Sequence, residues 1–265
     1  MKKTFITLLA LAGVAMGETA TYSPLTSTVG WTLGDSHTAK DGTPSINTTD
    51  GTLNGATIWA RSSAIYDVQD ITLSDEGDSL TVSFTITAGN TNTLLTGALI
   101  GNDKAIVLGH GGYSDEGKAD AIQYGTTSSD EGIWYNMQKE GSAMNNPSEG
   151  IVYVSTHGNT TGIFSANTPL TLTTSIKWDN AKSQFVATLC YGEGANSSTL
   201  TSYDLGASYT LEKLVFSQDG ADYQTISNLT IVETQAAPSS NVPEPATATL
   251  SLLALAGLAA RRRRH

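Results

Sequence analysis

The sequence predicts an all-β fold, an antiparallel β-sandwich placed between two terminal signal segments. Apolar and hydroxyl-bearing residues alternate with a period of two over several stretches, and no long segment between the termini has helical periodicity. Abundant Thr, Ser, Gly and Asn with few charged residues suits β-structure with many turns. About ten or more short strands separated by such turns are typical of an antiparallel sandwich or jelly roll.

Two regions show the alternation most clearly. Every second residue from Leu80 to Ile86 is apolar, and the residues between them are Thr or Ser. Residues 169–191 predict a β-hairpin, because two alternating runs flank the turn residues 179–183. Further strands are expected at 56–60, 94–100, 105–108, 132–137, 151–155, 211–217 and 226–233, with loops at 109–117 and 128–132. No internal repeat of fixed period is present, which disfavours a β-helix or a propeller.

Residues 1–17 predict a secretory signal peptide. Lys2 and Lys3 precede an apolar stretch that ends in small residues. Ala15 and Gly17 occupy the small-residue positions before a cleavage site, so we expect cleavage after Gly17. The alternative, a buried N-terminal helix, is disfavoured because no polar face runs along the stretch. Secretion machinery and signal peptidase are therefore expected partners.

The C-terminal residues mirror this pattern. A polar linker at 236–241 leads to a Pro-Glu-Pro element, an apolar run at 246–260 and a basic end. As a helix the apolar run spans about 22 Å, a marginal length for a hydrocarbon core of about 30 Å. A cluster of arginines favours the cytoplasmic side of a membrane. With both basic ends on that side, residues 18–235 are expected outside the inner membrane as one cargo domain.

Residues 242–265 resemble the PEP-CTERM sorting signal, which combines a Pro-Glu-Pro element, an apolar helix and a terminal arginine cluster. The resemblance implies recognition by a membrane-embedded exosortase and cleavage near this element, followed by release into the envelope or the extracellular space. The recognised residues would be Pro243, Glu244 and Pro245, and the orienting charges would be Arg261, Arg262, Arg263 and Arg264. The alternative is an ordinary tail anchor that is never processed.

Charge and cysteine content exclude several classes of protein. Without residues 1–17 and 246–265 the chain keeps 8 of its 14 Lys+Arg and all 25 Asp+Glu, a formal charge of −17. Such a balance repels phosphate backbones, so nucleic-acid binding is not expected. The single cysteine, Cys190, lies in a strand-like run and is expected as a core thiol rather than a reactive one.

The cargo domain at 22–233 is similar to concanavalin A-like and laminin-G-like sandwiches. The similarity lies in an early strand at Trp31, a hairpin around Trp178 and a closing strand at 226–232. It implies a jelly roll and carbohydrate binding. Such sandwiches also carry calcium on loop oxygens, for which the candidates here would be Asp115, Glu116 and Asp120.

Signatures of enzymes are not present in the sequence. No strand carries the Glu-x-Asp-x-Glu spacing that places two carboxylates across a sugar, and no zinc-type His or Cys pair occurs. The turn carboxylates Asp75, Glu76 and Asp78 are expected to be solvated. Trp59, Trp134 and Tyr135 are candidates for stacking on sugar rings, with core packing as the alternative.

The sequence thus predicts an exported, non-catalytic envelope or matrix protein without a required cofactor, which binds carbohydrate or has a structural role. The alternative is a divergent glycan hydrolase, whose carboxylates would have to converge in a groove of the fold.

Overall fold

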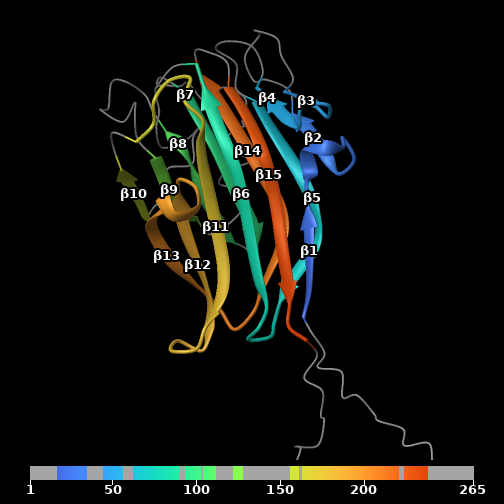
Figure 1. Ribbon diagram of the computed structural model, residues 1–265, viewed down its shortest axis with the longest axis vertical. Coiled ribbons are helices and arrows are strands. Elements are labelled where there is room, and N and C mark those ends of the chain that lie inside the picture. Colours follow the sequence, from blue (N-terminus) through green and yellow to red (C-terminus); the bar gives the residue numbers. More distant parts are fainter. Residues whose placement is uncertain are drawn as a thin grey trace, which may run out of the picture. The chain divides into compact units, whose positions relative to one another are not determined.

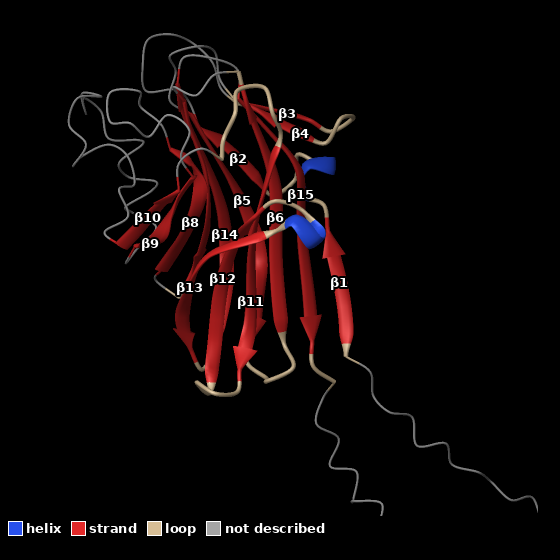
Figure 2. Ribbon diagram, turned by 60° about the vertical axis from the view of Figure 1, so that its left-hand side comes forward, coloured by secondary structure: helices blue, strands red, loops and turns tan. Residues whose placement is uncertain are grey.

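Two antiparallel sheets face each other in the computed structural model of this protein, with the hydrophobic core between them (Figure 1). The structure describes residues 17–34, 44–55, 62–89, 93–102, 104–111, 122–127, 156–160, 163–220 and 224–237. Within them, Thr19–Gln235 belong to one compact unit. Nearly every regular element is a strand, and the exceptions in the described residues are two single-turn 3-10 helices, η1 (Pro24–Thr26) and η3 (Gly194–Asn196) (Figure 2).

The first sheet, sheet A, has eight described strands. Its order is β13 (Ser198–Gly206), β12 (Gln184–Tyr191), β11 (Leu170–Asp179), β6 (Ser79–Ala88), β15 (Gln224–Gln235), β4 (Thr52–Asn54) and β3 (Ser45–Asn47). The remaining strand, β1 (Glu18–Tyr22), also pairs with β15.

The second sheet, sheet B, has seven described strands. Its order is β10 (Thr156–Thr160), β9 (Ile122–Thr127), β8 (Lys104–Gly111), β7 (Thr93–Gly101), β14 (Tyr209–Gly220), β5 (Ser62–Leu73) and β2 (Trp31–Gly34). The last two strands of the chain are interior strands, because β14 lies between β7 and β5 while β15 lies between β6 and β4. Sheet B is therefore complete only after β14 has paired with its neighbours, and sheet A only after β15 has done so.

The alternation read from the sequence is the reason for the two-layer fold. In β6 the apolar side chains of the alternating run are fully buried, and the intervening Thr and Ser side chains face outward. Phe84 of β6 meets Phe216 of β14 edge to face across the core, with ring centroids 5.3 Å apart. The antiparallel sandwich and the hairpin formed by β11 and β12 are confirmed. The strands expected at 94–100, 105–108, 211–217 and 226–233 are also confirmed.

Three local predictions were wrong. Gly109–Gly111 were expected in a loop, but they continue β8, where pairing with β7 and β9 outweighs the turn preference of glycine. Cys190 was expected in the core, yet β12 turns Phe185, Ala187 and Leu189 inward, so the half-buried thiol lies on the outer face. Asp78 was expected to be solvated, but it is 5% exposed and accepts hydrogen bonds from two backbone N–H groups of its own turn.

Other predictions lie outside the described residues. These are the signal peptide at 1–17, of which only residue 17 is described, the strands at 56–60, 132–137 and 151–155, the loop at 128–132 and the C-terminal apolar helix. Within the part of the chain that is described, no helix is long and apolar enough to cross a membrane.

Candidate functional site

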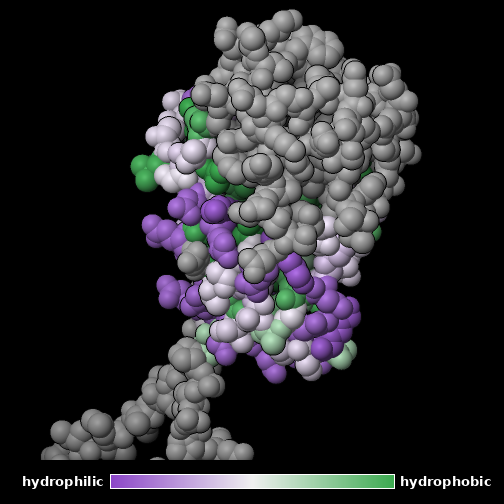
Figure 3. Space-filling model, turned by 180° about the vertical axis from the view of Figure 1, so that it is seen from behind, coloured by the Kyte–Doolittle hydropathy of each residue, from purple (hydrophilic) through white to green (hydrophobic). Residues whose placement is uncertain are grey.

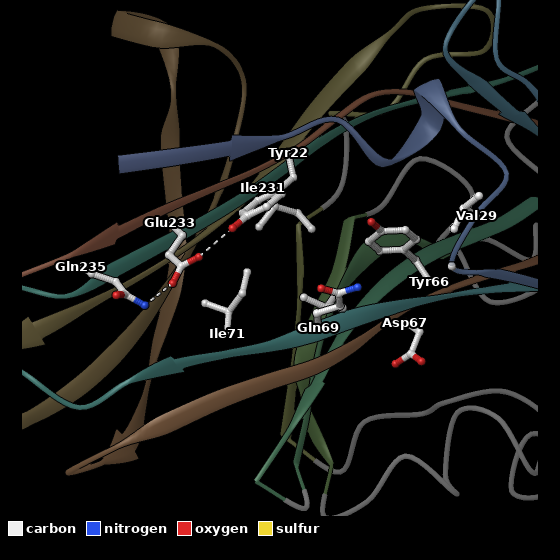
Figure 4. Close-up of a pocket in the computed structure, with 11 residues that line it drawn as sticks. Tyr22, Val29, Tyr66, Asp67, Gln69, Ile71, Ile231, Glu233 and Gln235 are labelled. Carbon is white, nitrogen blue, oxygen red and sulfur yellow. Dashed lines mark hydrogen bonds between the residues drawn. The ribbon is translucent and has the colours of Figure 1, made fainter. Parts of the chain in front are cut away.

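A groove of about 470 Å³ opens at one edge of the sandwich, between β5 of sheet B and the paired strands β1 and β15 of sheet A (Figure 4). Its volume is in the range of small-molecule sites, about 300–1,000 Å³. The residues that line it are Tyr22, Val29, Gly30, Tyr66, Asp67, Val68, Gln69, Ile71, Ile231, Glu233 and Gln235. We refer to it below as the edge groove.

Irregularities in two strands bring these side chains to the groove. The pairing of β5 with β14 shifts register between Leu211 and Lys213, so β5 turns Val68 inward before the shift and Ile71 inward after it. Such bulges re-aim side chains and are frequent beside functional sites. The pairing of β15 with β6 shifts at Asn228, whose φ is 51°. After this bulge the inward-facing residues of β15 are Leu229, Ile231 and Glu233.

Glu233 is a buried carboxylate, with 7% of its surface exposed. Its Oε2 accepts a hydrogen bond from the Tyr22 hydroxyl at 3.2 Å, and its Oε1 accepts one from the Gln235 Nε2 at 2.7 Å. Figure 4 shows the two donors approaching the carboxylate from opposite sides. Charged side chains are seldom buried without a partner of opposite charge. Here the two side-chain donors are neutral.

The Tyr66 ring is fixed in place before any ligand arrives. It packs against the Trp31 ring with centroids 5.1 Å apart, and the Trp31 Nε1 donates a hydrogen bond to the Pro24 carbonyl at 3.1 Å. Gly30, with φ 85°, lies so close that an added Cβ would be 3.0 Å from the tyrosine ring. A conformation with positive φ and such a close approach both favour glycine.

Exposed apolar side chains also line the edge groove. In the described residues, the exposed large hydrophobic side chains are Tyr22 at 43% and Val29 at 80%, and both line this groove. Seen from behind, the described surface is mainly hydrophilic or neutral, with small hydrophobic spots (Figure 3). Exposed rings and aliphatic groups beside hydrogen-bonding side chains are the features of a small-molecule site.

A second, shallower hollow lies on the outer face of sheet A. It is about 340 Å³ and is lined by Ser83, Thr85, Thr171, Thr173, Gly192, Glu193, Gly194 and Asn228. Its hydroxyl groups are engaged with one another across β6 and β11, as in the Ser83–Thr173 and Thr85–Thr171 contacts, each 3.1 Å. Cross-strand pairs of this kind stabilise a sheet by about 0.2–1 kcal/mol each. We therefore assign the hollow a structural role.

Other buried polar side chains belong to the core. The His110 ring stacks on Phe164 with centroids 3.8 Å apart. Burial raises the pKa of Tyr209, and the charge of Glu212 raises it further. No cluster of three His, Cys, Asp or Glu side chains able to hold a metal occurs in the described ranges.

The candidate residues chosen from the sequence all lie outside the described residues. This holds for the stacking candidates Trp59, Trp134 and Tyr135, for the calcium candidates Asp115, Glu116 and Asp120, and for the sorting and orienting residues Pro243, Glu244, Pro245 and Arg261–Arg264. The sequence reasoning missed Tyr22, Tyr66 and Glu233. The sequence did contain one signal for Glu233. It lies two positions after the inward-facing Ile231, where the alternation predicts an apolar residue.

Comparisons with known proteins give structural matches over most of the chain and a family match at its C-terminus only. No curated protein matches this chain in sequence. The solved structures similar to it include an endo-1,3-beta-glucanase from Streptomyces sioyaensis, with 9% identity, a TM-score of 0.48, and 79% of this chain and 91% of that chain covered. Basic winged bean lectin has 8% identity and a TM-score of 0.47, covering 84% of this chain and 100% of the lectin. Arcelin-5 from Phaseolus vulgaris, a lectin-like defence protein, has 8% identity and a TM-score of 0.45 with the same coverage. The family match lies in the C-terminus: residues 241–264 carry the PEP-CTERM protein-sorting motif.

Proposed function

We propose that this protein is exported, sorted through its C-terminal motif, and displayed in the cell envelope or matrix as a β-sandwich that binds carbohydrate in the edge groove. The sorting motif at residues 241–264 is the observation that supports export and sorting. The tyrosine-lined groove with its buried carboxylate supports the binding function.

The two ends of the chain agree with export. Lys2 and Lys3 begin the N-terminal apolar stretch, and four arginines follow the C-terminal one. Basic flanks stay on the cytoplasmic side, so the acidic domain between them is carried across the inner membrane. An exosortase would then act near Pro243–Pro245, and the remaining domain would stay in the envelope or leave the cell.

The chemistry of the edge groove suits a sugar ring. Sugars have apolar C–H faces that pack on aromatic rings, and Tyr22 and Tyr66 line the groove. Sugar hydroxyls both donate and accept hydrogen bonds, which suits the Glu233 carboxylate and the Gln69 and Gln235 amides. Because Trp31 and Gly30 already fix Tyr66, little side-chain entropy would be lost on binding.

The same lining supports binding rather than hydrolysis. Glycosidases place two carboxyl groups across the scissile bond, about 5–10 Å apart. The described acidic residues of the groove are Asp67 and Glu233, and Figure 4 shows the Asp67 carboxylate pointing away from Glu233. We therefore propose a non-catalytic role, without a required cofactor.

A glycan-array screen of the purified, processed protein tests the binding function, with and without calcium. The proposal predicts binding to at least one glycan class, and a loss of about tenfold in affinity for Tyr66→Ala, about 1.4 kcal/mol. The control is Tyr203→Ala, because Tyr203 is a half-buried tyrosine on β13 at the other end of the sheet A order. An array without any bound glycan in either condition, or equal losses in the two variants, would contradict the proposal.

A further inference from the structure

In the part of the chain that the structure describes, acidic side chains line the edge groove and basic ones do not. The acidic side chains are Asp67 and Glu233, and Lys213 of β14 lies opposite Asp67 in the strand pairing without lining the groove. The domain around it is also strongly acidic, with a formal charge of −17 once the terminal signals are removed. An anionic ligand would be repelled, and a cationic one attracted.

Glu233 has hydrogen-bonding capacity left for a ligand. An ionised carboxylate offers about four acceptor positions, and in this structure Tyr22 and Gln235 each occupy one. Both donors are neutral, so neither supplies the positive charge with which a buried carboxylate is usually paired. A protonated amine in the groove would supply up to three N–H donors and the missing positive charge.

We propose that the edge groove selects a carbohydrate that carries a protonated amino group, an amino sugar with a free amine. This inference rests on the proposed carbohydrate binding and names the substrate class. The tyrosine rings add to the selection, because the face of an aromatic ring attracts an ammonium group by about 0.5–2 kcal/mol. An N-acetylated sugar of the same ring structure has no charge and gains neither interaction.

A bare divalent cation fits the groove less well than an amine. Calcium takes six to eight oxygen ligands, usually from several carboxylates and carbonyl groups. Among the described lining residues the carboxylates are Glu233 and Asp67, and the Asp67 carboxylate points away from Glu233. The aromatic and aliphatic surface beside Glu233 also suits an organic ligand better than a hydrated metal ion.

Isothermal titration of the processed protein tests the inference with two matched probes, the β-1,4-linked tetramer of glucosamine and the same tetramer fully N-acetylated. We expect the free amine to bind at least tenfold more tightly. Glu233→Gln keeps the shape of the side chain and should remove most of this difference. Glu76→Gln changes the net charge equally at an exposed turn, so it should leave the difference intact.

The outcomes distinguish this inference from the function on which it rests. Equal binding of the two tetramers would overturn the amine preference and leave carbohydrate binding standing. If Glu233→Gln and Glu76→Gln reduce the affinity difference between the two tetramers equally, the amine is attracted by the overall charge of the domain. That result would also overturn the amine preference of the edge groove. If neither tetramer binds and the glycan array is empty, the carbohydrate function itself fails. If Glu233→Gln does not fold, the comparison of the two tetramers on the unaltered protein decides the question.

Discussion

The hydroxyl of Tyr22 donates a hydrogen bond to the carboxylate of Glu233, although 211 positions separate the two residues. The contact joins the first strand of the domain to its last strand. A second contact between the same strands, 3.2 Å between the Thr19 and Thr234 hydroxyl oxygens, lies alongside it. One wall of the edge groove is therefore complete only when both ends of the domain are in place.

Removing the Tyr22 hydroxyl tests whether this contact between β1 and β15 stabilises the domain. Tyr22→Phe keeps the ring and deletes a hydrogen bond to a charged, buried group, which contributes about 1.5–3 kcal/mol. We expect the free energy of unfolding to fall by an amount in this range, as measured by urea denaturation. Tyr66→Phe is the control, because the Tyr66 hydroxyl has no hydrogen bond to the described residues. Equal losses in the two variants would show that the Tyr22 hydrogen bond does not stabilise the domain.

The packing between the sheets is tight enough to be tested with one methyl group. A Cβ added at Gly97 of β7 would lie 2.6 Å from the Phe84 ring and 3.0 Å from the Phe216 ring. Gly97→Ala should therefore cost about 1–3 kcal/mol of stability. Adding Phe84→Leu to it should recover part of the loss, so that the two changes are not additive in a double-mutant cycle. Strict additivity would argue against this contact.

A surface ion pair predicts a small dependence of stability on pH. Lys182 Nζ lies 2.7 Å from the Asp204 carboxylate, and the side chains are 45% and 53% exposed. The hydrogen bond from Lys182 lowers the pKa of Asp204, and the hydrogen bond to Asp204 raises the pKa of Lys182. A lowered carboxyl pKa adds stability above the ordinary Asp pKa of 3.8, and this stability is lost as pH falls through the lowered value.

Asp204→Asn should accordingly lower the Tm slightly at pH 7 and leave it nearly unchanged at pH 2, where both proteins lack the carboxylate charge. Exposed pairs contribute little because water screens them. Thermal melts at the two pH values check this. A larger decrease in Tm at pH 2 than at pH 7 would contradict a stabilising ion pair between Lys182 and Asp204.

The sorting signal can be tested at its acidic residue. Glu244→Ala should prevent recognition of the Pro-Glu-Pro element, so the C-terminal segment should remain attached to the exported domain. Mass spectrometry of the C-terminal peptide checks this, with Ser239→Ala in the neighbouring linker as the control. Normal processing of the Glu244→Ala protein would exclude this element as the recognised signal.

The strands that alternate strictly were predictable, whereas the groove was not. β6, β11 and β12 each bury one face, and this local pattern is visible in the sequence. In β15 the bulge at Asn228 switches the inward face from Ile226 to Leu229, so the alternation breaks where the site begins. Strand β1 buries no residue and has no local signal, because only its pairing with β15 makes it a strand.

The short or polar strands were missed for related reasons. β13 is a strand rich in Ser and Thr with one buried residue, and β3 and β4 are three residues long. β5 contains the register shift that changes its inward face. In each case the partner strand supplies the information that the segment itself lacks.

The intact mass of the protein recovered from the envelope or the medium tests export and sorting together. We expect a mature chain that begins at Glu18 and has lost the arginine cluster through cleavage near Pro243–Pro245. Recovery of the full 265-residue chain from the cytosol, with Met1 and His265 both present, would contradict it.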